Sequence, residues 1–211
     1  METIIYLIRH SEQLKNKEIT TSENSQIANE QIILTVNGEH KAKILSESKE
    51  LLNIDVLWSS HYTRAILTAK YIAENNGIII NIDSNLGERK LGNLNSLNEM
   101  AKTKQFTYTT EQLLDYKLKN NGGENLLEVR GRAMKSFNEI LQNNKGKRIA
   151  IVSHGAAIKY MLLEWCQFNR DTHDIEYKGR IIAGEKLNSP EVFKLTFKYN
   201  ELIDLKKLEL K

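Results

Sequence analysis

Two kinds of apolar pattern alternate along this chain. Short runs of consecutive apolar and β-branched residues predict strands buried on both faces, as in a parallel sheet. Longer segments with apolar residues three or four positions apart predict helices that bury one side. The predicted strands cover residues 3–9, 55–58, 78–80 and 148–153; the predicted helices cover about 36–52, 61–75, 124–143 and 155–166. Strands that alternate with helices indicate an α/β fold.

The C-terminal part of the chain has a different pattern. Residues 192–197 and 202–208 form two apolar-rich segments around Tyr199-Asn200-Glu201, which predicts an antiparallel hairpin at the sheet edge. We therefore expect a three-layer α/β/α fold with a mostly parallel central sheet and this edge hairpin. The 211 residues suffice for a single domain over 1–211, with a small cap or insert at about 93–122. The polar segment 12–33 is predicted to be a long surface loop.

Charge and cysteine content constrain the partners and the compartment. The chain has 30 basic and 27 acidic residues, a net charge of +3, which argues neither for nor against a nucleic-acid partner. No apolar stretch is long enough to span a membrane, and the N-terminus lacks the pattern of a signal peptide. The single cysteine, Cys166, excludes an internal disulfide and is expected to pack in the core. We expect a cytoplasmic protein without a nucleic-acid or membrane partner.

Candidate chemistry lies where two predicted strands end. Arg9 and His10 close the strand 3–9, and His154 follows the strand 148–153. The carboxyl ends of parallel strands form the edge where ligands bind in open α/β sheets. Two imidazoles and a guanidinium group at that edge suggest a phosphate site with an imidazole nucleophile. The histidines do not have metal-ligand spacing and no Walker-type glycine loop is present, so we expect neither a metal nor another cofactor.

An ordered set of motifs over about residues 1–165 resembles the histidine phosphatase superfamily, the phosphoglycerate mutase-like phosphatases. The first motif is similar to the family's Arg-His-Gly-Glu, and a later one to its Ser-Ser-Pro-Leu-x-Arg-Ala. The matching segments are Arg9-His10-Ser11-Glu12, Asn16, Leu34-Thr35 with Gly38, Ser59-Ser60-His61-Tyr62-Thr63-Arg64-Ala65, Leu86-Gly87-Glu88, Gly123-Glu124 with Arg132, and Ser153-His154-Gly155.

The chain departs from the family pattern at some positions. Ser11 stands where glycine is common, His61 where proline is usual, and Ala156 where a second glycine is common. None of these changes removes a charged group that the chemistry needs. We interpret His61 as a polar residue at a helix start.

The resemblance implies that His10 attacks phosphorus and becomes phosphohistidine. Imidazole suits this role because its ordinary pKa of about 6.5 leaves it largely neutral at pH 7. Guanidinium groups bind phosphate in a fork geometry, and the N-terminus of the helix 155–166 would add amide donors. The residues expected at the phosphate are Arg9, Arg64, His154, Asn16 and Gly155.

The leaving alcohol needs a proton, and the resemblance assigns Glu88 as the general acid and then as the base that activates water. Glu12 and Glu124 are the alternative acids. Arg132 is predicted to be structural, because Glu128 lies four residues earlier on the same helix, a favourable ion-pair spacing.

Three functions remain open: a phosphatase for a small-molecule phosphomonoester or a phosphoprotein, a phosphoglycerate mutase, and a regulator that binds phospholigands with little turnover. Mutases of this family carry a longer insertion after the acid motif, so the short segment 93–122 favours the phosphatase. Phe106, Tyr108 and Tyr116 either line an apolar substrate wall or pack the cap. The edge hairpin either ends the sheet or pairs across a homodimer.

Overall fold

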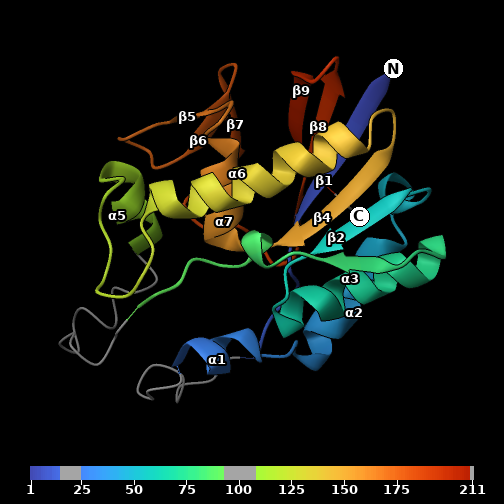
Figure 1. The fold of residues 1–211 in the computed structure, drawn as a ribbon, viewed down its shortest axis with the longest axis horizontal. Coiled ribbons are helices and arrows are strands. Elements are labelled where there is room, and N and C mark those ends of the chain that lie inside the picture. The colour runs from blue at the N-terminus through green and yellow to red at the C-terminus, as the bar shows by residue number, and fades with distance from the viewer. Residues whose placement is uncertain (15–24, 93–107, 210–211) are drawn as a thin grey trace.

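A six-stranded mixed sheet forms the centre of the fold, in the order β3-β2-β4-β1-β8-β9 (Figure 1). The computed structural model describes residues 1–14, 25–92 and 108–209. The sheet contains β1 (Glu2–Arg9), β2 (Val56–Ser59), β3 (Ile80–Ile82), β4 (Arg148–Ser153), β8 (Glu191–Lys198) and β9 (Glu201–Leu208). Strands β3, β2, β4 and β1 run parallel, whereas β8 pairs antiparallel with both β1 and β9. The predicted α/β class with a mostly parallel sheet and an edge hairpin is confirmed.

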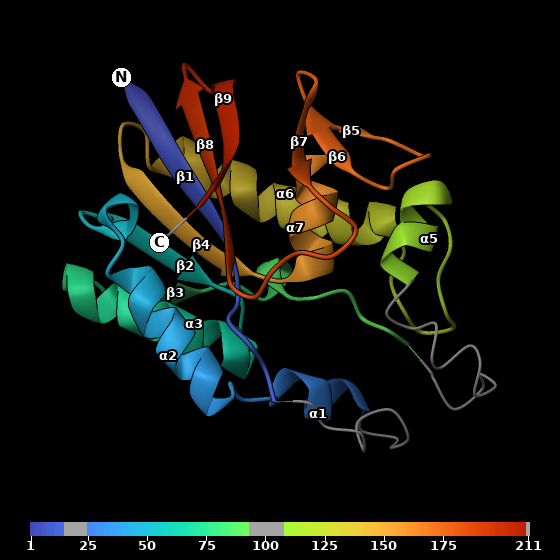
Figure 2. The same cartoon turned by 180° about the vertical axis from the view of Figure 1, so that it is seen from behind.

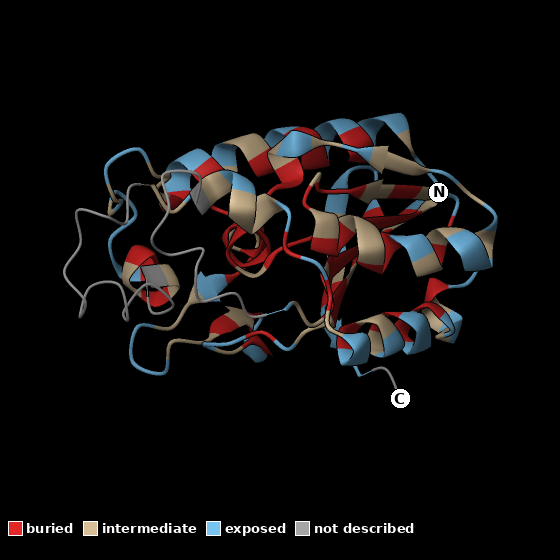
Figure 3. Ribbon diagram, turned by 90° about the horizontal axis from the view of Figure 1, so that it is seen from below, coloured by how far each residue is buried: buried red, intermediate tan, exposed pale blue. Residues whose placement is uncertain are grey.

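Helices cover both faces of the sheet (Figures 1 and 2). Apolar side chains of α2 (Val36–Ser46) and α3 (Thr63–Asn76) form one core with one face of the sheet. Those of α6 (Leu126–Asn143) and α7 (Gly155–Leu162) form the second core with the other face. Figure 3 shows the buried residues on the sheet and on the helix surfaces that face it. This arrangement explains the apolar strands, since a central strand with helices on both faces must be apolar on both.

The register of β1 against β4 positions the chemistry of the chain. Arg9 pairs with Ser153 as the last pair of the parallel ladder. The chain continues in register for one more step, because the His10 amide donates to the Ser153 carbonyl at 2.9 Å. The residues that follow the two strands, His10 and His154, therefore leave the sheet side by side.

Several boundaries differ from the sequence prediction by a few residues. The third strand covers Ile80–Ile82 rather than 78–80, because Gly77 ends α3 in the left-handed conformation and two further residues turn the chain toward the sheet. Helix α7 ends at Leu162 instead of residue 166. Helix α6 begins at Leu126, because Asn125 and Glu128 form a capping box.

A second sheet was not predicted from the sequence. Strands β5 (Gln167–Phe168), β6 (Ile175–Tyr177) and β7 (Arg180–Ala183) form a three-stranded antiparallel sheet between α7 and β8. Each strand is too short to show an alternating pattern, and this explains the omission.

The predicted surface loop 12–33 contains a helix, α1 (Ser25–Glu30), and its described ends are joined by a bridge between Gln13 and Leu34. The remaining described helices are short: η2 (Lys49–Leu51), η3 (Ser84–Leu86) and α5 (Tyr108–Leu114). Helix α5 belongs to the predicted insert 93–122, of which residues 93–107 lie outside the described residues.

The C-terminal hairpin has the predicted position and a tight turn. Tyr199 and Asn200 both have positive φ angles, 53° and 67°, which is the conformation of a two-residue hairpin turn. Cys166 is buried as expected, and burial raises the pKa of its thiol to about 12. Among the described residues, none of the helices has the length and apolar character to cross a membrane.

Candidate active site

His10 is held as a neutral imidazole whose Nε2 is the unprotonated nitrogen. Its Nδ1 lies 2.7 Å from the carbonyl oxygen of Ser11. A carbonyl oxygen can only accept, so Nδ1 carries the proton and Nε2 keeps its lone pair. The Arg64 guanidinium donates from Nε to this Nε2 at 3.2 Å. Complete burial, followed by the charges of Arg64 and Arg9, lowers the pKa of His10 well below its ordinary value.

His154 lies directly beside His10, with 5.1 Å between the ring centroids. Its Nε2 is 2.8 Å from the hydroxyl of Ser60, while its Nδ1 is buried and lacks a hydrogen-bond partner among the described residues. Burial is the main cause that lowers the pKa of His154 well below its ordinary value, and the charge of Arg64 adds to it. Two neutral imidazoles therefore share this site.

Two arginines bring positive charge to the histidine pair. Arg64, on the first turn of α3, is almost fully buried and also donates from Nη1 to the Asn29 carbonyl of α1 at 2.6 Å. Arg9 donates from Nη1 to the Leu187 carbonyl, and its Nε is buried without a partner in the described part of the chain. A methyl group at Gly155 would lie 3.5 Å from that Nε, so glycine leaves the guanidinium uncovered.

Glu88 occupies the N-terminus of α7, where the sequence predicted amide donors for phosphate. Its carboxylate accepts from the amides of Ala156 at 3.4 Å and Ala157 at 3.3 Å. The same carboxylate acts electrostatically on both Arg9 and Arg64. The carboxylate is therefore close enough to both guanidinium groups to interact with them electrostatically.

The predicted ion pair between Arg132 and Glu128 is wrong. Arg132 forms a two-point pair with Glu124, at 2.8 and 2.9 Å, while Glu128 pairs with Lys119. Capping of α6 turns Glu128 back toward the helix start and away from Arg132. Arg132 also donates to the carbonyls of Gly87 and Glu88, so its structural role is to fix the segment that carries Glu88.

Gly38, which follows Leu34-Thr35 in the matched motifs, stands where the fold leaves no room for a side chain. A methyl group at Gly38 would lie 2.1 Å from the Glu12 carbonyl oxygen. Ser11 binds the same turn, because its hydroxyl donates to the Gly38 carbonyl at 2.7 Å. The serine hydroxyl is thus satisfied where the family commonly has glycine. Glu12 pairs with Lys41 on α2 at 2.7 Å, and Glu124 is held by Arg132, so both alternative acids have other partners.

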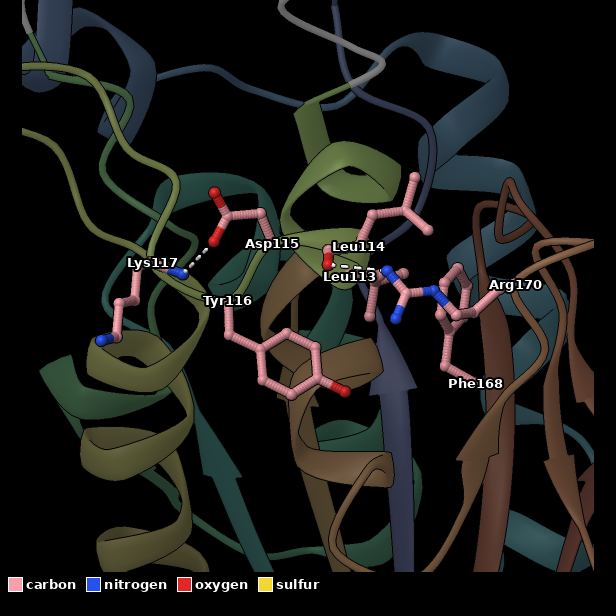
Figure 4. A pocket seen from close by; sticks show the side chains of 7 residues that line it. All are labelled: Leu113, Leu114, Asp115, Tyr116, Lys117, Phe168 and Arg170. Atoms are coloured by element: carbon pink, nitrogen blue, oxygen red, sulfur yellow. Dashed lines mark hydrogen bonds between the residues drawn. The ribbon is translucent and has the colours of Figure 1, made fainter.

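Other predicted residues fall outside this cluster. Asn16 and Phe106 lie outside the described residues, as does the side chain of Tyr108. Tyr116 lines a hollow of about 450 Å³ between the end of α5 and the second sheet (Figure 4), formed by Leu113, Leu114, Asp115, Tyr116, Lys117, Phe168 and Arg170. None of the histidine-pair residues lines this hollow. The described residues contain no group of three or more His, Cys, Asp or Glu side chains placed to hold a metal ion.

Sequence reasoning missed Tyr62, although it stands inside a matched motif. Its buried ring contacts that of His154, with 4.6 Å between the centroids, and the Arg64 guanidinium lies 4.7 Å from the ring centroid. The family pattern has leucine at the position of Tyr62, and a leucine side chain gives no reason to expect polar contacts there. The ring and the hydroxyl of Tyr62 contact groups from distant segments of the chain, which no local sequence pattern predicts.

The buried neutral histidines predict a loss of stability in mild acid. The unfolded chain binds a proton on each imidazole below about pH 6.5, whereas the folded chain does not until a much lower pH. The free energy of unfolding should then fall by up to about 1.4 kcal/mol per pH unit for each histidine below pH 6.5. Urea unfolding between pH 7.5 and 5 measures this slope. His10→Gln should flatten it, while the exposed His40→Gln should not; a midpoint independent of pH would contradict the buried neutral pair.

Comparison with known proteins identifies the family. Residues 5–177 match the model of the histidine phosphatase superfamily (branch 1). The chain belongs to this superfamily. A protein of Salmonella choleraesuis named probable phosphoglycerate mutase GpmB is 30% identical over 156 residues, which are 73% of this chain and 70% of the relative.

Solved structures share the fold at low identity. A mycobacterial glucosyl-3-phosphoglycerate phosphatase in complex with inorganic phosphate is similar with a TM-score of 0.69 and 17% identity, over 98% of this chain and 95% of the other. A mutant phosphoserine phosphatase from Entamoeba histolytica in complex with phosphoserine has a TM-score of 0.62 and 21% identity, over 97% and 96%. At these identities the similarity supports the fold alone.

Proposed function

We propose that this protein is a phosphomonoester hydrolase that works through a phosphohistidine on His10. The observation that carries the proposal is the state of His10: Nδ1 is tied to the Ser11 carbonyl, and Nε2 is unprotonated and accepts a hydrogen bond from Arg64 Nε. Attack requires Arg64 to turn from this Nε2 to the phosphoryl oxygens. A neutral nucleophile beside buried cations is the arrangement that attack on an anionic phosphoryl group requires.

In the first step, Nε2 of His10 forms a bond to phosphorus while the bond from phosphorus to the ester oxygen breaks. Arg9 and Arg64 stabilise the negative charge on the phosphoryl oxygens. If the Ser60 hydroxyl donates to Nε2 of His154, the proton of His154 is on the unpartnered Nδ1 and is available to a phosphoryl oxygen. Asn16 and Gly155 are the remaining residues that we propose for the phosphate site.

Glu88 serves as the acid and then as the base. Its position beside Arg9, Arg64 and the start of α7 lets it give a proton to the leaving oxygen and afterwards accept one from water. The water oxygen then bonds to phosphorus, the N–P bond breaks, and inorganic phosphate leaves. A mutase would instead return the phosphoryl group to a second hydroxyl of the substrate.

A small substrate panel tests the function. Purified protein is incubated with p-nitrophenyl phosphate, phosphoserine and 3-phosphoglycerate, and both inorganic phosphate and isomerised phosphoglycerate are measured. We expect phosphate release from small monoesters. Isomerisation without release would establish the mutase, and binding of phosphate without turnover of any ester would favour a phospholigand-binding regulator. A cytoplasmic location and a homodimer through the edge hairpin stay predictions.

A further inference from the structure

We propose that Tyr62 is a positioning residue that couples helix α1 to the orientation of Arg64 and His154. The inference rests on the proposed function, because it concerns how the phosphate-binding groups are held. Tyr62 precedes α3 and is 1% exposed. Its ring and hydroxyl contact different parts of the site, so one side chain connects groups that come from separate segments of the chain.

The ring of Tyr62 faces the two groups proposed to bind phosphate. The Arg64 guanidinium lies 4.7 Å from the ring centroid, a distance that gives an attractive cation–π contact. The His154 ring packs edge-on at 4.6 Å. The Tyr62 amide donates to the Ser60 hydroxyl at 3.2 Å, and that hydroxyl binds His154. The ring and backbone of Tyr62 therefore restrict both groups.

The hydroxyl of Tyr62 holds α1. Gln26 donates from Nε2 to this hydroxyl at 2.7 Å. Two neighbouring contacts hold the same helix: Asn29 accepts from Arg64 at 2.6 Å, and Glu30 lies 3.5 Å from Nε2 of His61. A six-residue helix is too short to be stable by itself, so its position depends on such contacts. Because Arg64 also contacts α1, displacement of the helix would move the guanidinium.

Tyr62 also approaches the segment that carries Glu88. A methyl group at Gly87 would lie 3.3 Å from its ring carbon Cε1. Burial is the main cause that raises the pKa of Tyr62 above its ordinary value, so the phenol stays protonated. We assign it a positional contribution because its ring contacts Arg64 and His154 and its hydroxyl binds Gln26.

Two substitutions separate the ring from the hydroxyl. Tyr62→Phe keeps the ring and removes the bond to Gln26, so KM for p-nitrophenyl phosphate should rise about 3- to 10-fold with little change in kcat. Tyr62→Leu supplies the residue of the matched family motif and removes the ring. It should also raise the inhibition constant of inorganic phosphate about 10-fold and lower kcat by a similar factor. Tyr71→Phe removes a hydroxyl of α3 that donates to Glu39 of α2; it is the matched control and should behave as the wild type.

A comparison of single and double variants tests the bond between Tyr62 and Gln26 and does not depend on whether Tyr62→Leu folds. Gln26→Ala removes the bond to Tyr62 and also a bond to Glu30, so it should raise KM at least as much as Tyr62→Phe. The double variant should do no more than Gln26→Ala alone, because the bond between Tyr62 and Gln26 is already absent there. Additive effects, or a folded Tyr62→Leu with wild-type kcat and phosphate inhibition, would overturn the positioning role. An inactive wild-type protein would instead refute the proposed function, so the two failures are distinguishable.

Discussion

His10→Ala is expected to lower kcat/KM for p-nitrophenyl phosphate by at least about 10⁴-fold, the largest loss for any single substitution in this chain. The loss follows from the removal of the atom that forms the bond to phosphorus. In the tautomer proposed above, the nearest imidazole, His154, carries its proton on Nδ1 and is bound through Nε2 to Ser60, so neither nitrogen offers a free lone pair. Steady-state kinetics of the wild type and variant measure the effect.

A chemical trap makes the result specific for a phosphohistidine. Wild-type protein quenched in alkali during turnover of labelled substrate should carry label that alkali preserves and acid releases, as expected for an N–P bond. His10→Ala should carry none. The matched control is His40→Ala, an exposed histidine on α2, which should keep both activity and labelling. A His10→Ala protein within tenfold of wild type would refute His10 as the nucleophile.

Glu88→Gln should give the second largest loss, and one that depends on the leaving group. For an alkyl ester such as phosphoserine, kcat should fall about 10²- to 10⁴-fold, because the leaving alkoxide needs a proton. For p-nitrophenyl phosphate the first step should be nearly unaffected, since p-nitrophenolate leaves without one. The second step lacks its base, so rapid-mixing experiments should show a burst of p-nitrophenol equivalent to the protein, followed by slow turnover.

Glu12→Gln is the matched control for this experiment. Glu12 was one of the two alternative acids from the sequence, but it lies on the α2 side in an exposed pair with Lys41. It should alter kcat by no more than a few-fold with either substrate. A large loss in Glu12→Gln together with a normal Glu88→Gln would reverse the assignment of the acid.

Sequence patterns could predict the elements that bury a continuous apolar surface. The strands 3–9 and 148–153 and the hairpin around Tyr199-Asn200 were each recognisable from local composition, because central strands and tight turns constrain their own residues. The second sheet and helix α1 were missed, since their segments are short and depend on contacts made elsewhere.

The partners of polar side chains were harder to predict. Arg132 had a well-spaced acidic neighbour on its own helix, yet it pairs with Glu124 because the capping box takes Glu128. The amides of Ala156 and Ala157 at the start of α7 donate to Glu88, a partner that the sequence did not suggest for them. These partners are determined by the path of the loops at the sheet edge, and local sequence patterns do not predict that path.

The sequence by itself determined the order of strands and helices, the family motifs and the candidate residues for phosphate chemistry, because these depend on residue type and spacing along the chain. Tertiary structure alone decided how those residues act on one another. The parallel register of β1 and β4 places His10 beside His154, burial keeps both neutral, and the Ser11 carbonyl selects the nitrogen that can attack. Each of these depends on distance and dielectric environment, which exist only once the chain has folded.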